Sequence, residues 1–393
     1  MGTLFRRADR GNNWYAQYVD HTGQRTVPRS TGTSDKATAK RILAKWEADA
    51  ALRREGVIDP AAERFTQQSS RSIREHLREF RSSLSSAGKT QNHIDKTAGA
   101  VETIADQYDW KTLSDITAEH VEAHGAALRT EGQSGRTIQR KLSAAKQFTR
   151  WLVATGRLAS NPLATVKTPS PRTDRRLERR ALHPDEWPLL RDATLAADPH
   201  ACGITGPQRA LLYELAIQTG LRSNELRSLT AGKLHLTQSP SFLTVPAGTA
   251  KNRRQARQYI STDLRDRLAK HAQTVGPGLP IFALPHPTEM ADMLRTDLAI
   301  ARETWIESAK TRRDRTTREK SEFLLPTDHE SRSLDFHALR HTCGAWLAMA
   351  GENPKTIQSI MRHSSITLTM DVYGHLFPAA ESDAIARLAD RHF

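Results

Sequence analysis

Cysteine is scarce in this sequence: Cys202 and Cys343 are the only two among 393 residues. They stand far apart and follow no pairing pattern, so the sequence offers neither a disulfide framework nor a cysteine-based metal site. No stretch approaches the roughly 18 consecutive apolar residues of a membrane span. The N-terminal residues also lack the apolar core of a secretory signal. We therefore expect a protein of the reducing cytoplasm that has no membrane partner.

Acidic residues are in the minority. The chain has 58 Lys and Arg residues against 44 Asp and Glu residues, a formal net charge of +14, and the basic residues are spread over its whole length. This balance favours a nucleic acid as partner, because each phosphate contact releases counterions. A solubilising surface charge is the alternative. With 37% hydrophobic and 26% charged residues, a globular protein of two or three domains is expected.

Residues 1–60 predict a small β-sheet with one helix. Runs rich in aromatic and β-branched residues at 14–19 and 25–27 flank the turn residues 20–23, a pattern that favours a hairpin. Apolar residues at helical spacing follow over 37–54. The sheet could present a basic face to DNA, or the module could be an accessory one with a solvated basic face. The basic residues concerned are Arg6, Arg7, Arg10, Arg25 and Arg29.

Two polar or basic segments flank a helical region. Residues 60–70 predict a linker, and residues 71–168 carry four amphipathic stripes that predict a compact four-helix domain. Residues 169–180 are rich in proline and then strongly basic, which predicts a linker able to follow a phosphate backbone. The fourth stripe, over 137–152, has a basic face formed by Arg136, Arg140, Lys141, Lys146 and Arg150.

Residues 181–393 predict the largest domain, which is mainly helical. A strand pair is expected near 241–245 and 255–260, joined by a basic loop that contains Lys251. A helix expected over 290–305 leads into a charged stretch at 310–315, which we expect to be mobile. The whole chain is therefore expected to be mainly α with small β elements (α+β).

Three features of this domain carry little weight when each is taken alone. Gly220 ends one predicted helix and Arg222 opens the next, with Glu225 one turn further on, which alone is typical of a surface ion pair. Lys251 alone is an ordinary solvated lysine. Tyr373 lies on a short predicted helix that ends at a glycine, and alone it is typical of a packing residue.

A fourth feature points to an anion. His337 and Arg340 share one face of a predicted helix, while Leu339 and Cys343 point inward. An arginine repels a cation but donates hydrogen bonds to phosphate oxygens, as a histidine also can, so this pair favours an anion over a metal. A metallonuclease site is the alternative and predicts inhibition by chelators. It would use His337, His341, His363 and His375.

In order and spacing these features resemble the tyrosine recombinase (phage integrase) family. The family pattern is an arginine in a T-G-L-R-x-x-E-L helix start, a hairpin lysine, H-x-L-R, a histidine in an L-G-H-S-S-like motif and a Y-G-H tyrosine. The matching residues here are Arg222, Lys251, His337, Arg340, His363 and Tyr373. The likeness extends over 180–380 by motif and over 71–168 by architecture, and residues 1–60 are similar to the arm-binding modules of some integrases. Arg362 departs from the usual glycine, which should alter the local turn and could add a phosphate contact.

The resemblance implies a site-specific DNA recombinase that needs no metal or other cofactor. Tyr373 would attack the scissile phosphate to give a 3′-phosphotyrosine bond and a free 5′-hydroxyl. Arg222 and Arg340 would bracket that phosphate, and His363 would add a third donor.

Further roles follow from the same resemblance. Lys251 would be the general acid for the leaving 5′-oxygen, and His337 the base or proton shuttle near the tyrosine. Glu225 would orient the first arginine.

Double-stranded DNA attachment sites in the nucleoid are the implied partners, with accessory DNA-bending or directionality proteins as further candidates. The amphipathic stretch 381–393 predicts a helix, with Ala384, Ile385, Leu388 and Ala389 on its apolar face. It could dock on a neighbouring protomer of a homotetramer or pack on its own domain. A type IB topoisomerase and a catalytically silent DNA-binding regulator are the alternatives, and the filled catalytic positions argue against the second.

Overall fold

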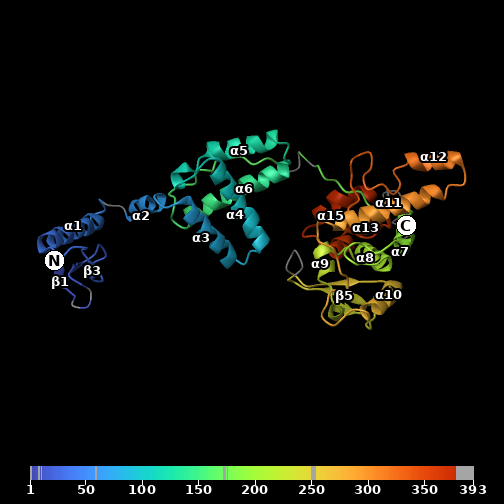
Figure 1. The fold of residues 1–393 in the computed structure, drawn as a ribbon, viewed down its shortest axis with the longest axis horizontal. Helices are drawn as coiled ribbons and strands as arrows, with labels where there is room; N and C mark the ends of the chain where they lie inside the picture. Colours follow the sequence, from blue (N-terminus) through green and yellow to red (C-terminus); the bar gives the residue numbers. More distant parts are fainter. Residues whose placement is uncertain are drawn as a thin grey trace, which may run out of the picture. The chain divides into compact units, whose positions relative to one another are not determined.

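The computed structural model describes residues 2–377 except 8, 10, 58–59, 171–173, 175 and 249–253. The chain divides into two compact units, Met1–Arg176 and Leu177–Phe393. Helices predominate and two small three-stranded sheets accompany them, so the predicted α+β class is confirmed (Figure 1). Within the described ranges, no helix is long and apolar enough to cross a membrane.

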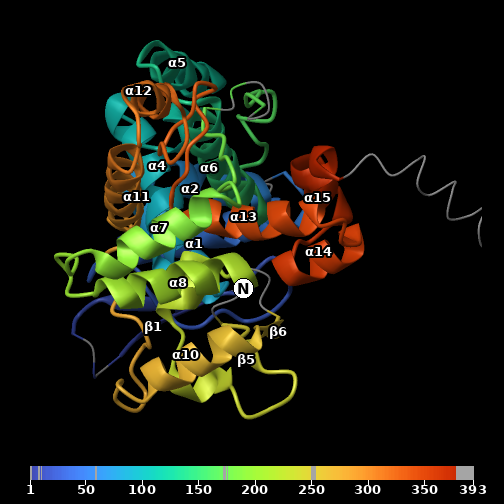
Figure 2. The ribbon, with the colours of Figure 1, turned by 90° about the vertical axis from the view of Figure 1, so that its right-hand side faces the viewer.

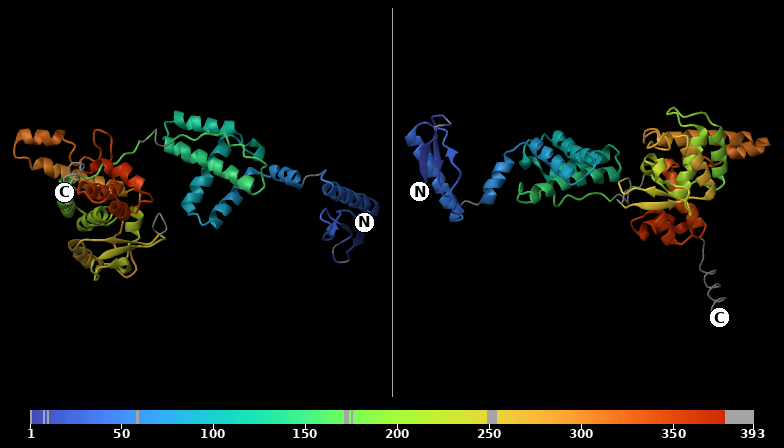
Figure 3. Two further views of the ribbon diagram at one scale, coloured as in Figure 1. Left: turned by 180° about the vertical axis from the view of Figure 1, so that it is seen from behind. Right: turned by 90° about the horizontal axis from the view of Figure 1, so that it is seen from below.

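The first unit begins with a three-stranded antiparallel sheet in the order β1-β2-β3. The strands are β1 (Thr3–Arg6), β2 (Trp14–Gln17) and β3 (Arg29–Ser30). The predicted hairpin is present only as a bridge between Val19 and Arg25, and β1 was missed because four residues are too few for a clear alternation. Helix α1 (Lys36–Arg54) begins after Asp35, whose side chain caps it, and packs on the sheet (Figure 3).

The rest of the first unit is helical. The four predicted stripes form helices that each begin after a Ser or Thr whose hydroxyl accepts a backbone N–H. The segment 60–70, which we predicted as a linker, is helical: α2 occupies it with good helix formers such as Arg64 and Gln67. The elements are α2 (Pro60–Ser69), α3 (Ile73–Ser86), α4 (Gln91–Gln107), η1 (Leu113–Asp115), α5 (Ala118–Thr130) and α6 (Gly135–Ala154).

The second unit contains nine of the described α-helices and a second small sheet in the order β4-β5-β6. The predicted strand pair is confirmed as β5 and β6, to which a short β4 is added. The strands and short helices are η2 (Ala231–Lys233), β4 (Leu234–His235), β5 (Phe242–Val245), β6 (Ala256–Tyr259) and η3 (Gly374–Leu376). The helices are α7 (Glu186–Ala196), α8 (Gly206–Thr219), α9 (Ser223–Arg227), α10 (Thr262–Ala272), α11 (Met290–Glu307), α12 (Arg312–Lys320), α13 (Phe336–Met349), α14 (Pro354–Met361) and α15 (Ile366–Tyr373).

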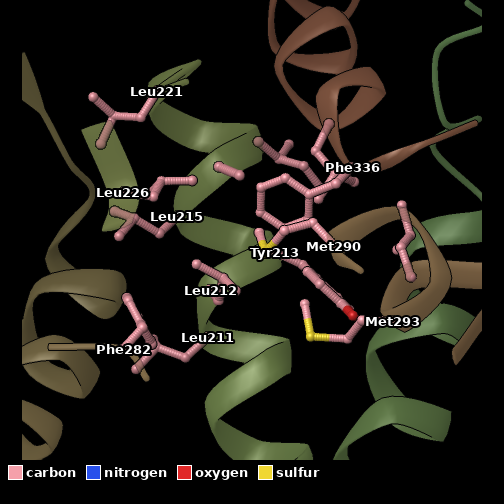
Figure 4. Packing of buried hydrophobic residues seen from close by; sticks show 14 of the residues in the cluster. Leu211, Leu212, Tyr213, Leu215, Leu221, Leu226, Phe282, Met290, Met293 and Phe336 are labelled. Atoms are coloured by element: carbon pink, nitrogen blue, oxygen red, sulfur yellow. The ribbon is translucent and has the colours of Figure 1, made fainter. Parts of the chain in front are cut away.

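Helix α8 forms the centre of this unit. Leu212, Tyr213 and Leu215 are each fully buried, and α8 packs against α7, α10 and α13 (Figure 4). The Tyr213 hydroxyl donates to Asp297 on α11 at 2.7 Å, and Arg209 forms a buried two-point ion pair with the same carboxylate. Because this buried carboxylate is fully paired, α8 is a rigid support for the turn that follows it.

The expectation of a mobile stretch at 310–315 is wrong. Residues 312–320 form α12, which begins after Thr311 with the Asp314 backbone N–H bound to the threonine hydroxyl. Arg318 lies over the Trp305 ring at 5.1 Å and pairs with Asp314 at 2.9 Å. Arg318 thus anchors this charged helix to α11, and Arg302 of α11 adds a hydrogen bond to the Glu319 carbonyl at 2.9 Å.

Candidate active site

Gly220 forms the turn between α8 and α9. Its φ of +58° lies in the left-handed region that glycine adopts without strain. A Cβ atom there would lie 3.0 Å from Met361 Sδ and 3.3 Å from Cys343 Sγ, so close packing also requires glycine. Arg222 follows as the N-cap of α9, and Glu225 accepts from its backbone N–H at 2.8 Å and from its Nη1 at 3.3 Å. The Arg222 side chain remains 26% exposed.

Arg340 connects this turn to the next motif. It lies on α13, only 4% exposed, and donates through Nη1 to the Gly220 carbonyl and through Nη2 to the Met361 carbonyl. Burial, followed by the positive charges of Arg222 and Arg362, lowers the pKa of Arg340 to about 10. Because both hydrogen-bond partners are neutral, this cation favours an anion beside it.

His337 lies one turn before Arg340 on the same helix, and its side chain is exposed. Desolvation of the ring, followed by the positive charges of Arg179 and Arg340, lowers its pKa to about 4. Because the ring is exposed, we attribute the lowered pKa mainly to the two positive charges and less to desolvation. His337 is therefore neutral near pH 7, the state that a proton acceptor requires.

His363 is held between α14 and α15. Its Nδ1 lies 2.9 Å from the Thr369 hydroxyl, which orients the ring. Burial, followed by the charges of Arg340 and Arg222, lowers its pKa to about 4. The neutral ring still offers a hydrogen bond to an anion, and a bound phosphate would favour its protonated form.

Tyr373 is the last residue of α15 and is 2% exposed. Its ring stacks on His341, with 5.1 Å between centroids, and lies almost parallel to His363 at 6.4 Å. Its hydroxyl faces Gly344, where a Cβ atom would lie 2.5 Å from the phenol oxygen. Burial raises the pKa of Tyr373, and the charge of Arg340 opposes that rise only in part.

The interpretation of Glu225 as part of a surface pair is wrong, because the residue is 3% exposed and is shared by two arginines. Arg362 Nη2 donates to Glu225 Oε2 at 2.6 Å, and the Arg362 side chain is 5% exposed. Arg362 has a φ of +50°, so it adopts the left-handed conformation that a glycine would take without strain. A buried carboxylate in the motif therefore has two cationic partners.

Helix α13 packs against α8, α14 and α15, so the motif residues meet around it (Figure 2). Lys251 and residues 381–393 lie outside the described residues. In the described ranges, no group of three His, Cys, Asp or Glu side chains is arranged to hold a metal ion. The residues brought together are Arg222, Glu225, His337, Arg340, His363 and Tyr373.

Three contributors to the site were not identified from the sequence. Asp335 caps α13 and forms a two-point ion pair with Arg179 at 2.8 and 2.7 Å, which ties the chain leading into this unit to the helix that carries Arg340. Gly344 makes room for the tyrosine. It follows Arg340 by four residues, so helical spacing alone could have placed it on the same face. His341, considered only as a metal ligand, instead stacks on Tyr373.

Two family models match the chain, and together they cover more than half of it. The phage integrase family matches residues 195–379, and the phage integrase N-terminal SAM-like domain matches residues 95–156. The tyrosine recombinase XerC of Neisseria gonorrhoeae is 26% identical over 280 residues, covering 67% of this chain and 76% of that protein. The XerC of Chlorobaculum parvum is 28% identical over 260 residues, covering 63% and 71%.

Solved structures share the fold. A lambda integrase dimer bound to a COC′ core site matches with a TM-score of 0.56 and 18% identity, over 94% of both chains. The Tn1549 transposon integrase in complex with transposon right end DNA matches with a TM-score of 0.54 and 15% identity, over 82% of this chain and 99% of that one. With the family models covering both the helical region and the motif residues, this chain belongs to the phage integrase family and is a tyrosine site-specific DNA recombinase.

Proposed function

We propose that this recombinase cleaves DNA by attack of the Tyr373 hydroxyl on the scissile phosphate. The single observation that carries the proposal is the gathering of Arg222, Arg340 and His363 around the segment that bears Tyr373, from separate parts of the chain. These cationic or hydrogen-bonding groups favour an anion with several oxygens, and a phosphodiester is such an anion.

The proposed step conserves the energy of the phosphodiester. A bond forms between the phenol oxygen and phosphorus while the bond from phosphorus to the 5′-oxygen breaks, giving a 3′-phosphotyrosine. The phenol proton passes to a base, for which neutral His337 is the candidate, and Lys251 supplies a proton to the leaving oxygen. Arg222 and Arg340 stabilise the charge that develops on the non-bridging oxygens. Reversal by a new 5′-hydroxyl rejoins the strands.

The Tyr373 hydroxyl makes no hydrogen bond to the described part of the chain and lies against Gly344. Because burial raises the pKa of Tyr373, its phenol needs a base to accept the proton as it attacks. The exposed Ile366, Leu368 and Met370 show that part of α15 has little cover in this chain.

We propose double-stranded attachment sites as the DNA partner and a homotetramer as the active assembly. The solved lambda integrase tetramer is bound to a Holliday junction, which supports this assembly for a family member. In this chain, Arg136, Arg140 and Arg150 are exposed along α6, which suits a core-site contact by residues 71–168. Residues 1–60 would serve as the arm-binding module, residues 169–180 as the basic linker, and residues 181–393 as the catalytic domain. Exchange of residues 381–393 between protomers and accessory DNA-bending proteins belong to the same proposal.

Covalent trapping tests the proposed nucleophile. Sequences selected by the full chain from a random duplex pool would be rebuilt as nicked substrates, in which the cleaved fragment diffuses away and the adduct accumulates. In EDTA we expect a covalent protein–DNA band that is lost in Tyr373→Phe while DNA binding persists. Absence of the band on every selected site, or its persistence in Tyr373→Phe, would reject the proposal.

The acid role of Lys251 has a separate test. Cleavage should slow in Lys251→Ala and recover when the leaving 5′-oxygen is replaced by sulfur, because a thiolate departs without protonation. A variant that stays slow on the sulfur substrate would reject that role.

A further inference from the structure

Arg362 occupies a backbone conformation that is costly for its residue type. Its φ of +50° is left-handed, and a non-glycine residue there is less stable than glycine by about 1–2 kcal/mol. Such strain persists when a residue's side chain has a use at the site. We therefore expect the contacts of the Arg362 side chain to explain its conformation.

The Arg362 side chain points into the protein. It is 5% exposed, and its Nη2 donates at 2.6 Å to Glu225, whose side chain is 1% exposed. Its Nε and Nη1 are also buried and find no hydrogen-bond partner among the described residues. Burying a cation with two donors that lack hydrogen-bond partners costs folding free energy. The ion pair with Glu225 must therefore account for the buried position of the Arg362 guanidinium.

Arg222 and Arg362 compete for the same carboxylate. Glu225 Oε2 accepts hydrogen bonds from Arg362 Nη2 at 2.6 Å and from the Arg222 backbone N–H at 2.8 Å. The Arg222 guanidinium donates only to Oε1, at 3.3 Å. The shorter and more deeply buried pair takes the larger share of the carboxylate's charge. The Arg222 guanidinium, 26% exposed, therefore keeps most of its donors free.

We propose that Arg362 is a positioning residue: it neutralises Glu225 and so leaves the Arg222 guanidinium available to the scissile phosphate. This role rests on the proposed function. Arg362 itself does not need to touch the phosphate, because its free nitrogens are buried in the described arrangement. Without it, the buried Glu225 carboxylate would draw the Arg222 guanidinium into a closer pair and away from the phosphate.

A double-mutant cycle tests this mechanism. Arg362→Gly relieves the backbone and removes the charge, and we expect it to slow single-turnover cleavage of the nicked substrate by about tenfold or more. Glu225→Gln removes the competing charge, so the double variant should cleave no more slowly than Glu225→Gln alone. Arg362→Lys keeps a positive charge that can donate one hydrogen bond to Glu225, so this variant should retain much of the cleavage rate. Ser331→Gly is the matched control, since Ser331 is exposed and has a φ of +59°.

Other outcomes would overturn the proposal. If Arg362→Gly has no effect on the rate, Arg362 has no role in positioning. If it slows cleavage by the same factor in the wild-type and Glu225→Gln backgrounds, Arg362 acts on the phosphate directly or only through folding. Thermal unfolding of each variant separates these two, because only a folding effect lowers the midpoint in parallel with the rate.

A binding measurement separates this proposal from the proposed chemistry. In a Tyr373→Phe background, the Kd is measured for sites with a natural or an uncharged methylphosphonate group at the scissile position. We expect Arg362→Gly to reduce the preference for the charged group and Glu225→Gln to restore it. An unchanged preference would overturn the role of Arg362 even if cleavage is observed. Failure of all cleavage would reject the nucleophile and leave this readout intact.

Discussion

The phenol ring of Tyr373 stacks on the imidazole of His341, with ring centroids 5.1 Å apart and an angle of 29° between the planes. The two residues come from α15 and α13, so the stack joins the helix that ends at Tyr373 to the helix that carries Arg340. Gly344 lies one turn after His341 and receives the phenol oxygen. The position of the tyrosine thus depends on its stack with His341 and on the absence of a side chain at Gly344.

Gly344→Ala should displace the tyrosine from this position. The added methyl group would lie 2.5 Å from the phenol oxygen, and overpacking of this kind destabilises a fold by about 1–3 kcal/mol. We expect faster nitration of Tyr373 by tetranitromethane together with a lower urea midpoint. Gly99→Ala is the control, because that α4 glycine has open space around its Cβ position and should gain about 0.5–1 kcal/mol. Unchanged nitration in Gly344→Ala would contradict the packing described here.

His341 should make the fold less stable in mild acid. Burial, followed by the charges of Arg179 and His337, lowers its pKa to about 4 in the folded state, against about 6.5 in an unfolded chain. The unfolded state therefore binds the proton more readily, and the contribution of His341 to stability is present above pH 6.5 and lost as the pH falls toward 4. Urea unfolding from pH 7 to pH 4.5 should show a shallower loss of stability in His341→Gln than in the wild type. Equal slopes would show that the ring titrates normally in the folded protein.

Asp335 should contribute more to the free energy of unfolding than an ordinary helix cap does. Its carboxylate accepts the Ala338 backbone N–H at 3.0 Å and both nitrogens of the Arg179 fork. Asp335→Ala loses the cap, at about 1–2 kcal/mol, and leaves Arg179 without this carboxylate. Asp335→Asn can keep the cap but not the ion pair, so we expect its loss of unfolding free energy to be smaller. Chemical denaturation of the two variants checks the order, and a larger loss in the asparagine variant would contradict it.

The sequence predicted the local elements of the site well. The end of α8 at Gly220 depends on the left-handed glycine, and the opening of α9 at Arg222 depends on short-range hydrogen bonds with Glu225. Tyr373 lies at the end of a short helix, as predicted. Such signals act within a few residues, so they are visible in the order of the amino acids.

Features that depend on partners distant in the chain were not predictable. The burial of Glu225 depends on Arg362, 137 positions away, and nothing near Glu225 signals that a second arginine will reach it. The stacking of His341 on Tyr373 likewise depends on how α13 and α15 pack. Alone, Glu225 is typical of a surface ion pair, and only the tertiary fold decides otherwise.

The error at α12 has the same origin and leads to a test. A run of charged residues predicts mobility when no apolar face is present, yet Arg318 supplies packing through its side-chain stem and its stack on Trp305. Arg318→Ala removes this stack, the ion pair with Asp314 and the hydrogen bond to Ser308 Oγ at 2.9 Å. We expect faster amide exchange and proteolysis across 312–320, because a nine-residue helix is marginal without tertiary contacts.

The matched substitution Arg313→Ala removes a charge of the same sign from an exposed position on the same helix. If the net charge of the segment governed its order, the two variants would loosen α12 equally. If the contact with α11 governs it, Arg318→Ala alone should raise the exchange rate by about tenfold, the equivalent of about 1.4 kcal/mol of local stability. Equal protection of 312–320 in both variants would show that other contacts, such as those of Arg302 with the carbonyls of Phe323 and Glu319, hold the helix in place.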